Sequence, residues 1–422
     1  MMTLRLAWRS FVRHRRRSII SSAAIAFGLG LMLWFVGIST DSHKQMIDLG
    51  IHMGSGHIIV QGKGFQEAQT LDHVLVDPAP VIDAAKKLPG VQHVARRVLS
   101  GGLLTAGDRS AATILAGVEP QIEPKISKIA SAGCLVRGHY LRTRSELDFT
   151  KQPADIYLGV DLAESLGVEL GDRVVLTASP RGSSRPASAA FLVRGLFRTG
   201  LDDLDASMAQ IAVDEAQSLL RLGKSVTQVT VLLDDVDATV AATQKLSAAL
   251  SSRAEAIEIL PWMVALRELY DALVLDDMSL YMFMGIIFII VAIGIFNTVL
   301  TSVVERTREL GVMMAIGTSR WRLFLLIMAE AMVLAVVASL AGVAFGGILH
   351  GVVAHYGIDV AAMAGGDYEF AGIAFTGKIY SQLSVEAVIK WTSLVIGIVL
   401  LSALYPATRV STLRPVEAMR HV

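Results

Sequence analysis

Residues 305–322 read ERTRELGVMMAIGTSRWR and separate two long apolar runs of the chain. None of residues 278–304 is charged, and residues 323–349 contain a single charged side chain, Glu330. An α-helix needs about 20 apolar residues to cross the hydrocarbon core of a bilayer, so each run is long enough to span a membrane. The charged stretch is therefore predicted to be a short loop between two membrane helices.

The cations of this loop predict the side of the membrane on which it lies. Its basic residues are Arg306, Arg308, Arg320 and Arg322, and it contains no lysine. Short loops with an excess of basic residues stay on the cytoplasmic side of a membrane protein. We therefore expect residues 305–322 to face the cytoplasm.

The composition indicates a membrane part and a soluble part in one chain. Hydrophobic residues make up 53% of the 422 residues, and the mean hydropathy is +0.54, yet 18% of the residues are charged. The formal net charge is zero, which gives no electrostatic support for binding to nucleic acid. Cys134 is the single cysteine, so a disulfide within the chain is excluded.

The start of the chain predicts an amphipathic helix, residues 1–17, on the cytoplasmic membrane surface. Leu4, Trp8 and Phe11 fall on one helical face, which suits burial at the level of the lipid headgroups. The basic residues that would bind anionic headgroups are Arg5, Arg9, Arg13, Arg15, Arg16 and Arg17.

Residues 18–40 are predicted to form the first span. A basic start followed by an apolar run also suits a secretory signal. The run is longer than a typical signal core and has no convincing cleavage site of small residues. We therefore favour an uncleaved helix with the N-terminus in the cytoplasm.

Residues 41–277 contain no further run that could cross a membrane, so they are predicted to form one large extracytoplasmic domain. Short apolar strands alternate with helical segments, which indicates a mixed α/β fold. Residues 41–125 and 208–277 are predicted to form one subdomain into which residues 126–207 are inserted. A helix over residues 261–277 is expected to run straight into the second span, residues 278–304.

The rest of the chain completes a four-span topology. The third span, residues 323–349, is followed by a short extracytoplasmic loop, residues 350–385. Residues 386–408 form the fourth span, and the tail, residues 409–422, returns to the cytoplasm with Arg409, Arg414 and Arg420. Both termini and every short basic segment then lie on the same side, as the distribution of positive charge requires.

Two glycine pairs in the third span have the spacing that lets helices approach closely, Gly342 with Gly346 and Gly347 with Gly351. Glycine is also simply common in membrane helices. The sequence leaves both interpretations open.

The search for catalytic motifs is negative. The chain has no nucleotide-binding G-x-x-x-x-G-K-[ST] loop, no H-E-x-x-H, no paired cysteines and no G-x-S-x-G. His52 and His57 are the nearest histidine group, and we expect no metal site there. The sequence therefore predicts neither catalytic residues nor a metal or cofactor in this chain.

The charged loop itself is predicted to hold a short helix. Residues 305–310 extend the second span, Gly311 loosens the helix, and residues 317–319 form a turn and N-cap before the third span. Residues 312–316 form a small apolar surface between charges, which suits docking in a groove of a cytoplasmic partner. The same residues are equally compatible with a connecting loop that binds no partner.

The loop resembles the coupling-helix region of FtsX/MacB-like permeases of the type VII ABC transporter superfamily. That family has the pattern Glu-Arg-x-x-Glu-Leu/Ile-Gly, then Ala-Ile/Val-Gly, then a glutamate early in the next span. Here the pattern is matched by Glu305, Arg306, Glu309, Leu310, Gly311, Ala315, Ile316, Gly317 and Glu330. LAWRSFVRHRRRS resembles the start of permeases of the LolC/LolE lipoprotein-releasing branch. DIYLGVDLAESLGVELGDRVVL resembles the family's extracytoplasmic domain, and LRPVEAMRHV resembles its C-terminal signature.

The resemblance implies a permease subunit that pairs with a second permease subunit, identical or different, and with separate cytoplasmic ABC ATPase subunits. ATP and magnesium would bind to those subunits, and the cargo would be a lipoprotein passed to a periplasmic carrier. The location implied is a bacterial inner membrane with the large domain in the periplasm. The residues expected to couple to the ATPase are Glu305, Arg306, Glu309, Leu310, Gly311, Met314, Ala315 and Gly317.

Glu330 lies about 12 Å along the third span from Arg322, at about 1.5 Å per residue. An acid at this depth is costly unless it faces protein or water. We expect it to pair with an arginine of the loop or of the N-terminal helix. The alternative is that the side chain of Glu330 extends to the membrane–water interface without pairing.

Alternative functions remain open at the level of the sequence. The chain also suits efflux of small molecules or peptides from the periplasm, as in MacB-like proteins, and regulation of a cell-wall hydrolase, as in FtsX-like proteins. A membrane-anchored receptor without an ATPase is a further alternative. Lipoprotein release is the function that we favour.

Overall fold

The computed structural model describes residues 13, 15–143, 153–359, 368–370, 373–375 and 378–411. Most of the predicted surface helix, with Arg5 and Arg9, and most of the predicted tail lie outside these residues. The chain forms two compact units. The membrane unit takes the described residues of Met1–Lys44, Val274–Val360 and Gly377–Val422, and the α/β unit takes those of Gln45–Leu273 and Ala361–Thr376.

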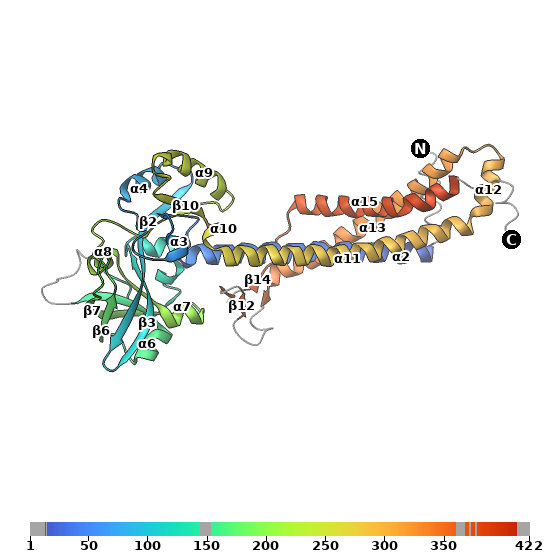
Figure 1. Ribbon diagram of the computed structural model, residues 1–422. Coiled ribbons are helices and arrows are strands. Elements are labelled where there is room, and N and C mark those ends of the chain that lie inside the picture. Colours follow the sequence, from blue (N-terminus) through green and yellow to red (C-terminus); the bar gives the residue numbers. More distant parts are fainter. Residues whose placement is uncertain are drawn as a thin grey trace. The chain divides into compact units, whose positions relative to one another are not determined.

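The membrane unit is built on long helices that lie side by side (Figure 1). In the described part of the chain, four helices are long and apolar enough to cross a membrane. They are α2 (Arg15–Gly50), α11 (Arg267–Glu305), α13 (Arg320–Tyr356) and α15 (Val385–Ser411), and the short α12 (Thr307–Ala315) lies between α11 and α13. Each long helix contains one predicted span and runs past it, because backbone hydrogen bonds continue where the side chains become polar.

The helix that enters the second span begins later than predicted. A short helix, α10 (Trp262–Ala265), ends at Leu266, whose φ of −109° and ψ of 55° are not helical. α11 then starts at Arg267, so residues 261–277 are not one helix. The indole of Trp262 is buried, which holds this first turn against the α/β unit rather than in line with α11.

The α/β unit contains a sheet with the strand order β10-β1-β9-β2-β3-β8-β5-β7-β4, with β6 paired to β2 and β7. Neighbouring strands are antiparallel except for the pairs β3–β8 and β5–β7. The strands are β1 (Ile58–Gly62), β2 (Val91–Ala106), β3 (Arg109–Val118), β4 (Leu135–Gly138), β5 (Ala154–Gly159), β6 (Arg173–Ala178), β7 (Ala187–Phe197), β8 (Met208–Ala212), β9 (Gln228–Leu233) and β10 (Ile257–Pro261).

Helices pack on this sheet and bury one continuous apolar core. α4 and α9 contact the part made by β2, β9 and β10, and α6, α7 and α8 contact the part made by β3, β5, β7 and β8 (Figure 1). The short elements of the unit are η1 (Ile51–Ser55), α3 (Phe65–Ala68), α4 (Ala79–Lys86), α5 (Glu123–Ile126), η2 (Lys128–Ala130), α6 (Val160–Leu166), α7 (Asp202–Ser207), α8 (Val213–Leu219), α9 (Thr239–Ala249) and η4 (Ser251–Arg253).

The α/β unit does not divide where the sequence predicted. β8 lies after residue 207 but pairs with β5 of the middle piece, and the end of β2 pairs with β6 of the same piece. The start of β2 pairs instead with β9, from the last part of the unit. The division therefore falls within the long strand β2, because one strand supplies ladder hydrogen bonds to both halves of the sheet.

The predicted external loop is shorter than expected, because α13 continues to Tyr356 and α15 begins at Val385. Its described strands are β11 (Ile358–Asp359), β12 (Tyr368–Phe370), β13 (Ile373–Phe375) and β14 (Lys378–Ile379). The buried carboxylate of Asp41 on α2 accepts hydrogen bonds from Tyr380 N at 2.8 Å and from Gln382 Nε2 at 2.7 Å. The end of this loop is thereby tied to α2.

α2 and α13 touch backbone to backbone at one of the two glycine pairs. A Cβ on Gly342 would lie 3.0 Å from the carbonyl oxygen of Ala26, and one on Gly346 would lie 3.0 Å from that of Gly30. Gly347 and Gly351 have open space instead. Small residues in the first pair allow close approach of two helices in lipid, where dispersion contacts drive association.

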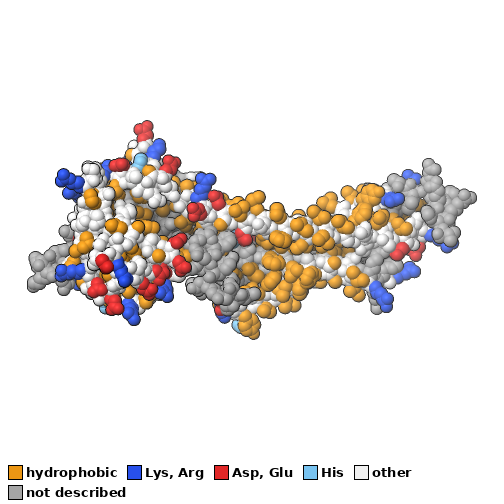
Figure 2. Space-filling model, turned by 60° about the horizontal axis from the view of Figure 1, so that its bottom comes forward, with side chains coloured by type: hydrophobic (Ala, Val, Ile, Leu, Met, Phe, Trp, Pro, Cys, Tyr) orange, Lys and Arg blue, Asp and Glu red, His pale blue; other side chains and the backbone are white. Residues whose placement is uncertain are grey.

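The remaining surface of the membrane unit suits contact with lipid. Hydrophobic side chains, orange in Figure 2, dominate the visible face of its long helices. α11 exposes the largest share of its apolar stretch, because only 17% of its most apolar window is buried, against 44% for the corresponding windows of α2 and α13. α2 and α13 thus form the packed centre of this unit.

Replacing Gly346 with leucine should destabilise the membrane unit. The added side chain must displace the backbone of α2, and overpacking of this kind costs about 1–3 kcal/mol. We expect the midpoint of thermal unfolding, followed by helical circular dichroism of the purified chain in nanodiscs, to fall. Gly347→Leu is the matched control and should leave the midpoint unchanged; equal losses in both variants would contradict the contact.

Candidate coupling site

The turn from the second span into the loop is set by the backbone of Arg306. α11 ends at Glu305, and Arg306 has a φ of −104° and a ψ of 12°, which breaks the helix before α12 begins at Thr307. The Thr307 hydroxyl donates a hydrogen bond to the carbonyl of Val303 at 3.0 Å, and the amide of Leu310 donates to the carbonyl of Arg306. These bonds join the two helices directly, with no intervening loop.

α12 lies against the bundle with one face. Leu310 and Gly311 are buried, and Met313 and Met314 are half-buried against a cluster that includes Leu323. Gly311 does not loosen the helix as predicted, since it lies within α12 on this packed face. A residue without a side chain suits close packing of α12 here, and the helix does not break at this position.

A glycine ends α12. Gly317 has a φ of +101°, a conformation that favours glycine, and its amide donates to the carbonyl of Met314 at 3.0 Å. Ser319 then occupies the N-cap position of α13, although its side chain makes no capping hydrogen bond. The predicted turn at residues 317–319 is therefore present, with backbone hydrogen bonds in place of the side-chain cap.

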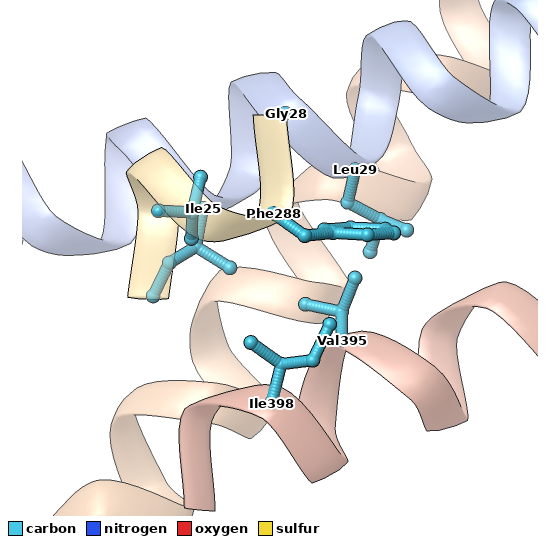
Figure 3. A pocket seen from close by; sticks show the side chains of 7 residues that line it. Ile25, Gly28, Leu29, Phe288, Val395 and Ile398 are labelled. Atoms are coloured by element: carbon cyan, nitrogen blue, oxygen red, sulfur yellow. The ribbon is translucent and has the colours of Figure 1, made fainter. Parts of the chain in front are cut away.

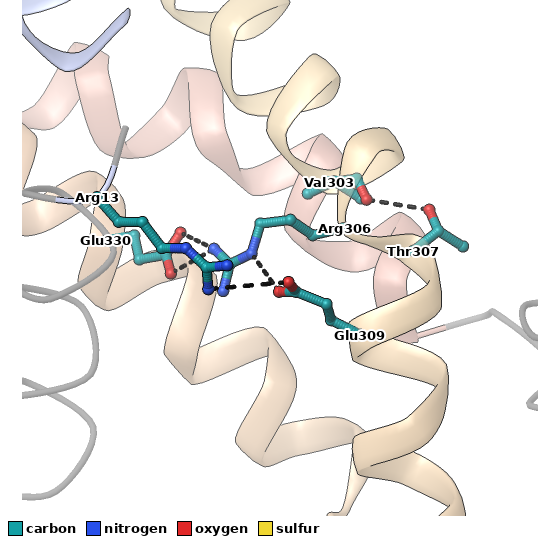
Figure 4. Close-up of polar contacts among 6 residues, drawn as sticks. All are labelled: Arg13, Val303, Arg306, Thr307, Glu309 and Glu330. Atoms are coloured by element: carbon teal, nitrogen blue, oxygen red, sulfur yellow. Dashed lines mark hydrogen bonds and ion pairs between the residues drawn. The ribbon is translucent and has the colours of Figure 1, made fainter. Parts of the chain in front are cut away.

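A cluster of charged side chains fastens α12 to the third span (Figure 4). Nη1 of Arg306 donates hydrogen bonds to Oε1 and Oε2 of Glu330 at 2.8 and 3.1 Å, and its Nε donates to Glu309 Oε2 at 3.2 Å. Nη1 of Arg13 lies 4.0 Å from Glu309 Oε1. Glu330 therefore pairs with an arginine of the loop, as predicted, and Glu309 links the same arginine to the start of the chain.

The electrostatics of this cluster favour its charged form. Partial burial alone would lower the pKa of Arg306, but its hydrogen bonds to Glu330 and Glu309 and their negative charges outweigh burial and raise that pKa. The side chains of Arg306 and Glu330 are only 18% and 20% exposed. A pair this shielded from water resists salt screening better than a surface ion pair does.

The opposite face of α12 and the turn after it are exposed. The exposed apolar side chains are Val312, Ala315, Ile316 and Trp321. Ile316 is 81% exposed, and the Trp321 ring stacks on Phe324 while remaining 65% exposed. The exposed cations around them are Arg308, Arg320 and Arg322.

The predicted site residues thus separate into three groups. Leu310, Gly311 and Met314 face the bundle, and Arg306 with Glu309 and Glu330 forms the charged cluster. Glu305, Ala315 and Gly317 lie on the exposed side. Arg13 and Arg16 are exposed, and Arg15 and Arg17 lie in the first turns of α2. Trp321 was missed, although an aromatic residue between two arginines at a membrane boundary is a recognisable signal.

A small apolar crevice lies between α2, α11 and α15 (Figure 3). It forms because Gly28 has no side chain, and it is lined by Ile25, Gly28, Leu29, Phe288, Val291, Val395 and Ile398. None of these residues carries a group for acid, base or metal chemistry. In the described part of the chain, no group of histidines, cysteines and carboxylates could hold a metal ion.

His57 and Cys134 lie in surroundings that suit a structural role rather than a reactive one. His57 is buried and its Nδ1 accepts a hydrogen bond from the amide of Leu233, and burial lowers the pKa of His57 to about 4. Burial raises the pKa of the half-buried Cys134 thiol, which makes it a poor nucleophile at neutral pH. Neither residue offers a reactive group.

Family models match both parts of the chain. A model described as FtsX-like permease C-terminal matches residues 281–415, and one described as MacB-like periplasmic core domain matches residues 18–249, more than half of the chain. The periplasmic region of MacB from Actinobacillus actinomycetemcomitans, a solved structure, is 20% identical over 50% of this chain and 91% of its own, with a TM-score of 0.35.

Curated relatives align over nearly the whole chain. The lipoprotein-releasing system transmembrane protein LolC of Neisseria meningitidis serogroup B is 22% identical, over 96% of this chain and 94% of its own length. The macrolide export ATP-binding/permease protein MacB of Shewanella oneidensis is 24% identical, over 99% of this chain but 60% of its own length.

Replacing Glu330 with glutamine should weaken the attachment of α12. The Arg306 guanidinium would lose its charged partner in a shielded site, a loss worth about 1–3 kcal/mol. We expect faster proteolysis within residues 305–322 in inside-out vesicles or nanodiscs. The double variant Arg306→Gln/Glu330→Gln should recover part of the loss, because it removes the unpaired charge.

Arg308→Gln provides the control for this measurement. Arg308 is exposed on α12, so its loss should leave the proteolysis rate unchanged. Equal acceleration in the Arg308 and Glu330 variants would show that the pair does not hold α12.

Proposed function

The chain belongs to the FtsX/MacB-like family of ABC transporter permeases, and from this premise we propose that it releases lipoproteins from the outer leaflet of a bacterial inner membrane. In this proposal it is the membrane subunit of the transporter. Separate ATPase subunits bind and hydrolyse ATP in the cytoplasm, and two permease subunits pair in the membrane. Both termini lie in the cytoplasm, and the α/β unit lies in the periplasm.

The exposed face of α12 is the observation that carries the proposal. Val312, Ile316 and Trp321 expose apolar side chains beside arginines on a segment that is too charged to lie in lipid. A groove with an apolar floor and acidic rims would bury these side chains and pair with the cations. The ATPase subunit is the partner that we assign to this face.

The charged cluster explains how a push on α12 would be passed on. Arg306 lies where α11 ends and is held by Glu330 of α13. A displacement of α12 therefore acts on two membrane helices at once. α11 continues without a break from Glu305 to Arg267, so its axis is a rigid path across the membrane.

The energy needed to release a lipoprotein explains why ATP hydrolysis would have to drive this step. Burial of an acyl chain is worth about 0.8 kcal/mol per CH₂ group, so three chains amount to roughly tens of kcal/mol. Spontaneous release at that cost is negligible. The alignment with LolC over nearly all of both chains supports this cargo, and we propose that a periplasmic carrier accepts it.

Efflux is the second candidate, because MacB-named relatives also align over nearly the whole of this chain, although it spans 60% of their length. The two functions differ in what accompanies the permease. Efflux requires a route across the outer membrane, whereas lipoprotein release requires bound acylated protein. Regulation of a cell-wall hydrolase would require neither.

Copurification from native membranes should identify the partners. Mass spectrometry of the complex is expected to find an ABC ATPase together with acylated proteins. An ATPase with an outer-membrane factor and no acylated protein would favour efflux instead. A complex without any ATPase would overturn the central proposal.

Replacing Ile316 with aspartate should uncouple the two subunits. The substitution puts a carboxylate on the exposed apolar face, where it would meet the acidic rims of the groove. We expect at least about a tenfold loss of affinity for the ATPase, the equivalent of about 1.4 kcal/mol, with normal membrane insertion.

Val264→Asp is the matched control, since Val264 is an exposed apolar residue of the α/β unit. It should leave ATPase binding unchanged in the same pull-down and ATP-turnover measurements. Unchanged binding of the Ile316 variant would exclude the exposed face of α12 as the docking surface.

A further inference from the structure

A histidine on α2 lies between two carboxylates of α11. His43 Nε2 is 2.8 Å from Asp276 Oδ2, and His43 Nδ1 is 3.7 Å from Asp277 Oδ1. The imidazole is only 16% exposed, whereas both carboxylates are about half exposed. All three residues belong to the membrane unit and follow or precede the predicted spans on the extracytoplasmic side.

This geometry suits a protonated ring better than a neutral one. A neutral imidazole can donate one hydrogen bond, here to Asp276, whereas an imidazolium also attracts the Asp277 carboxylate, which lies at ion-pair distance from Nδ1. Without a positive charge between them, Asp276 and Asp277 also repel each other and lose their attraction to α2. Ser39 Oγ, 3.4 Å from Nε2, is a neutral partner and does not replace that charge.

The other charged groups nearby are engaged elsewhere or point outward. On α2, the Asp41 carboxylate accepts hydrogen bonds from Tyr380 and Gln382, and Lys44 is exposed. On α11, Asp271 pairs with Arg267. Among the residues that the structure describes, the charged partners of His43 are therefore Asp276 and Asp277.

A second polar contact joins the same two helices without any charge. Ser21 Oγ lies 3.1 Å from Thr298 Oγ1, toward the cytoplasmic ends of α2 and α11. Hydroxyl groups do not titrate in the physiological range, so this contact is insensitive to pH. Of these two contacts, the one at His43 can respond to protons and the one at Ser21 cannot.

We propose that His43, Asp276 and Asp277 form a proton-dependent clasp between α2 and α11. The clasp is closed when His43 is protonated and opens as the pH on the extracytoplasmic side rises. Imidazole groups ordinarily change charge between about pH 5 and 8. α2 leads the chain into the α/β unit and α11 leads it back, so the clasp joins the two connections to that unit.

The consequence for transport rests on the proposed function. If motion passes along α11, an open clasp frees α11 from α2, and a closed clasp makes the two helices move together. Cargo release would then depend on the external pH. The clasp itself is tested without any ATPase or cargo, so its failure and the failure of the proposed function are distinguishable.

The test measures the separation of the two helices as a function of pH. Spin labels are attached at Lys44→Cys and Leu275→Cys, both exposed positions beside the clasp, in a Cys134→Ser chain in nanodiscs. We expect dipolar broadening of the spectra at about pH 5 that is lost by about pH 8. His43→Gln should show weak broadening at both pH values, and His43→Lys, with its lasting charge, strong broadening at both.

His52→Gln is the matched control. His52 also pairs with an aspartate, Asp48, but the two lie four residues apart in the sequence, so this pair does not join α2 to α11. Its loss should leave the pH response intact. A wild-type spectrum that does not change with pH, or a pH response that survives in His43→Gln, would overturn the clasp.

Discussion

The pairing of Arg306 with Glu330 is the interaction on which the turn between α11 and α13 depends. A carboxylate within an apolar helix needs a cation, and the nearest backbone that can supply one is the end of the preceding span. Forming the pair requires α11 to end at Glu305 and α12 to lie back against α13. The same arrangement leaves Val312 and Ile316 on the outer face of α12. One ion pair therefore sets both the anchored and the exposed side of the coupling segment.

The membrane helices differ in how firmly they are held. α2 and α13 touch through glycine backbones, and Asp41 ties the end of the external loop to α2. α11 is joined to α2 by polar contacts at Ser21 and His43 and buries the smallest share of its apolar surface. α11 also packs through apolar side chains such as Ile295 and Val299, but a helix held by side chains is easier to displace than one in close backbone contact. This contrast suits a transporter in which one long helix carries movement while its neighbours keep the membrane anchor intact.

Much of the architecture was predictable because the bilayer restricts the chain so strongly. An apolar run of sufficient length in a chain with basic flanks has few alternatives, and residues 278–304 and 323–349 lie within α11 and α13 as expected. The pairing of Glu330 was predictable for the same reason. The break at Leu266 and the division of the sheet within β2 were not, because they depend on the burial of Trp262 and on ladder partners distant in sequence. The role of Gly311 was predicted wrongly, because a glycine in a helical sequence gives the same local pattern whether the helix breaks there or packs closely against a neighbour.

The sequence by itself determined the membrane class, the four apolar segments, the mixed α/β domain between the first two and the residues that carry the family pattern. These follow from hydropathy, charge and local motif, which are properties of contiguous residues. The tertiary structure alone decided which side chains of residues 305–322 face the bundle, which glycine pair joins α2 to α13, and that His43 meets two carboxylates of α11. Each of these depends on how a helix is rotated about its axis and on which neighbour it contacts. For the glycine pair and for His43, the contacting segments lie more than two hundred residues apart in the sequence. No local pattern encodes such contacts.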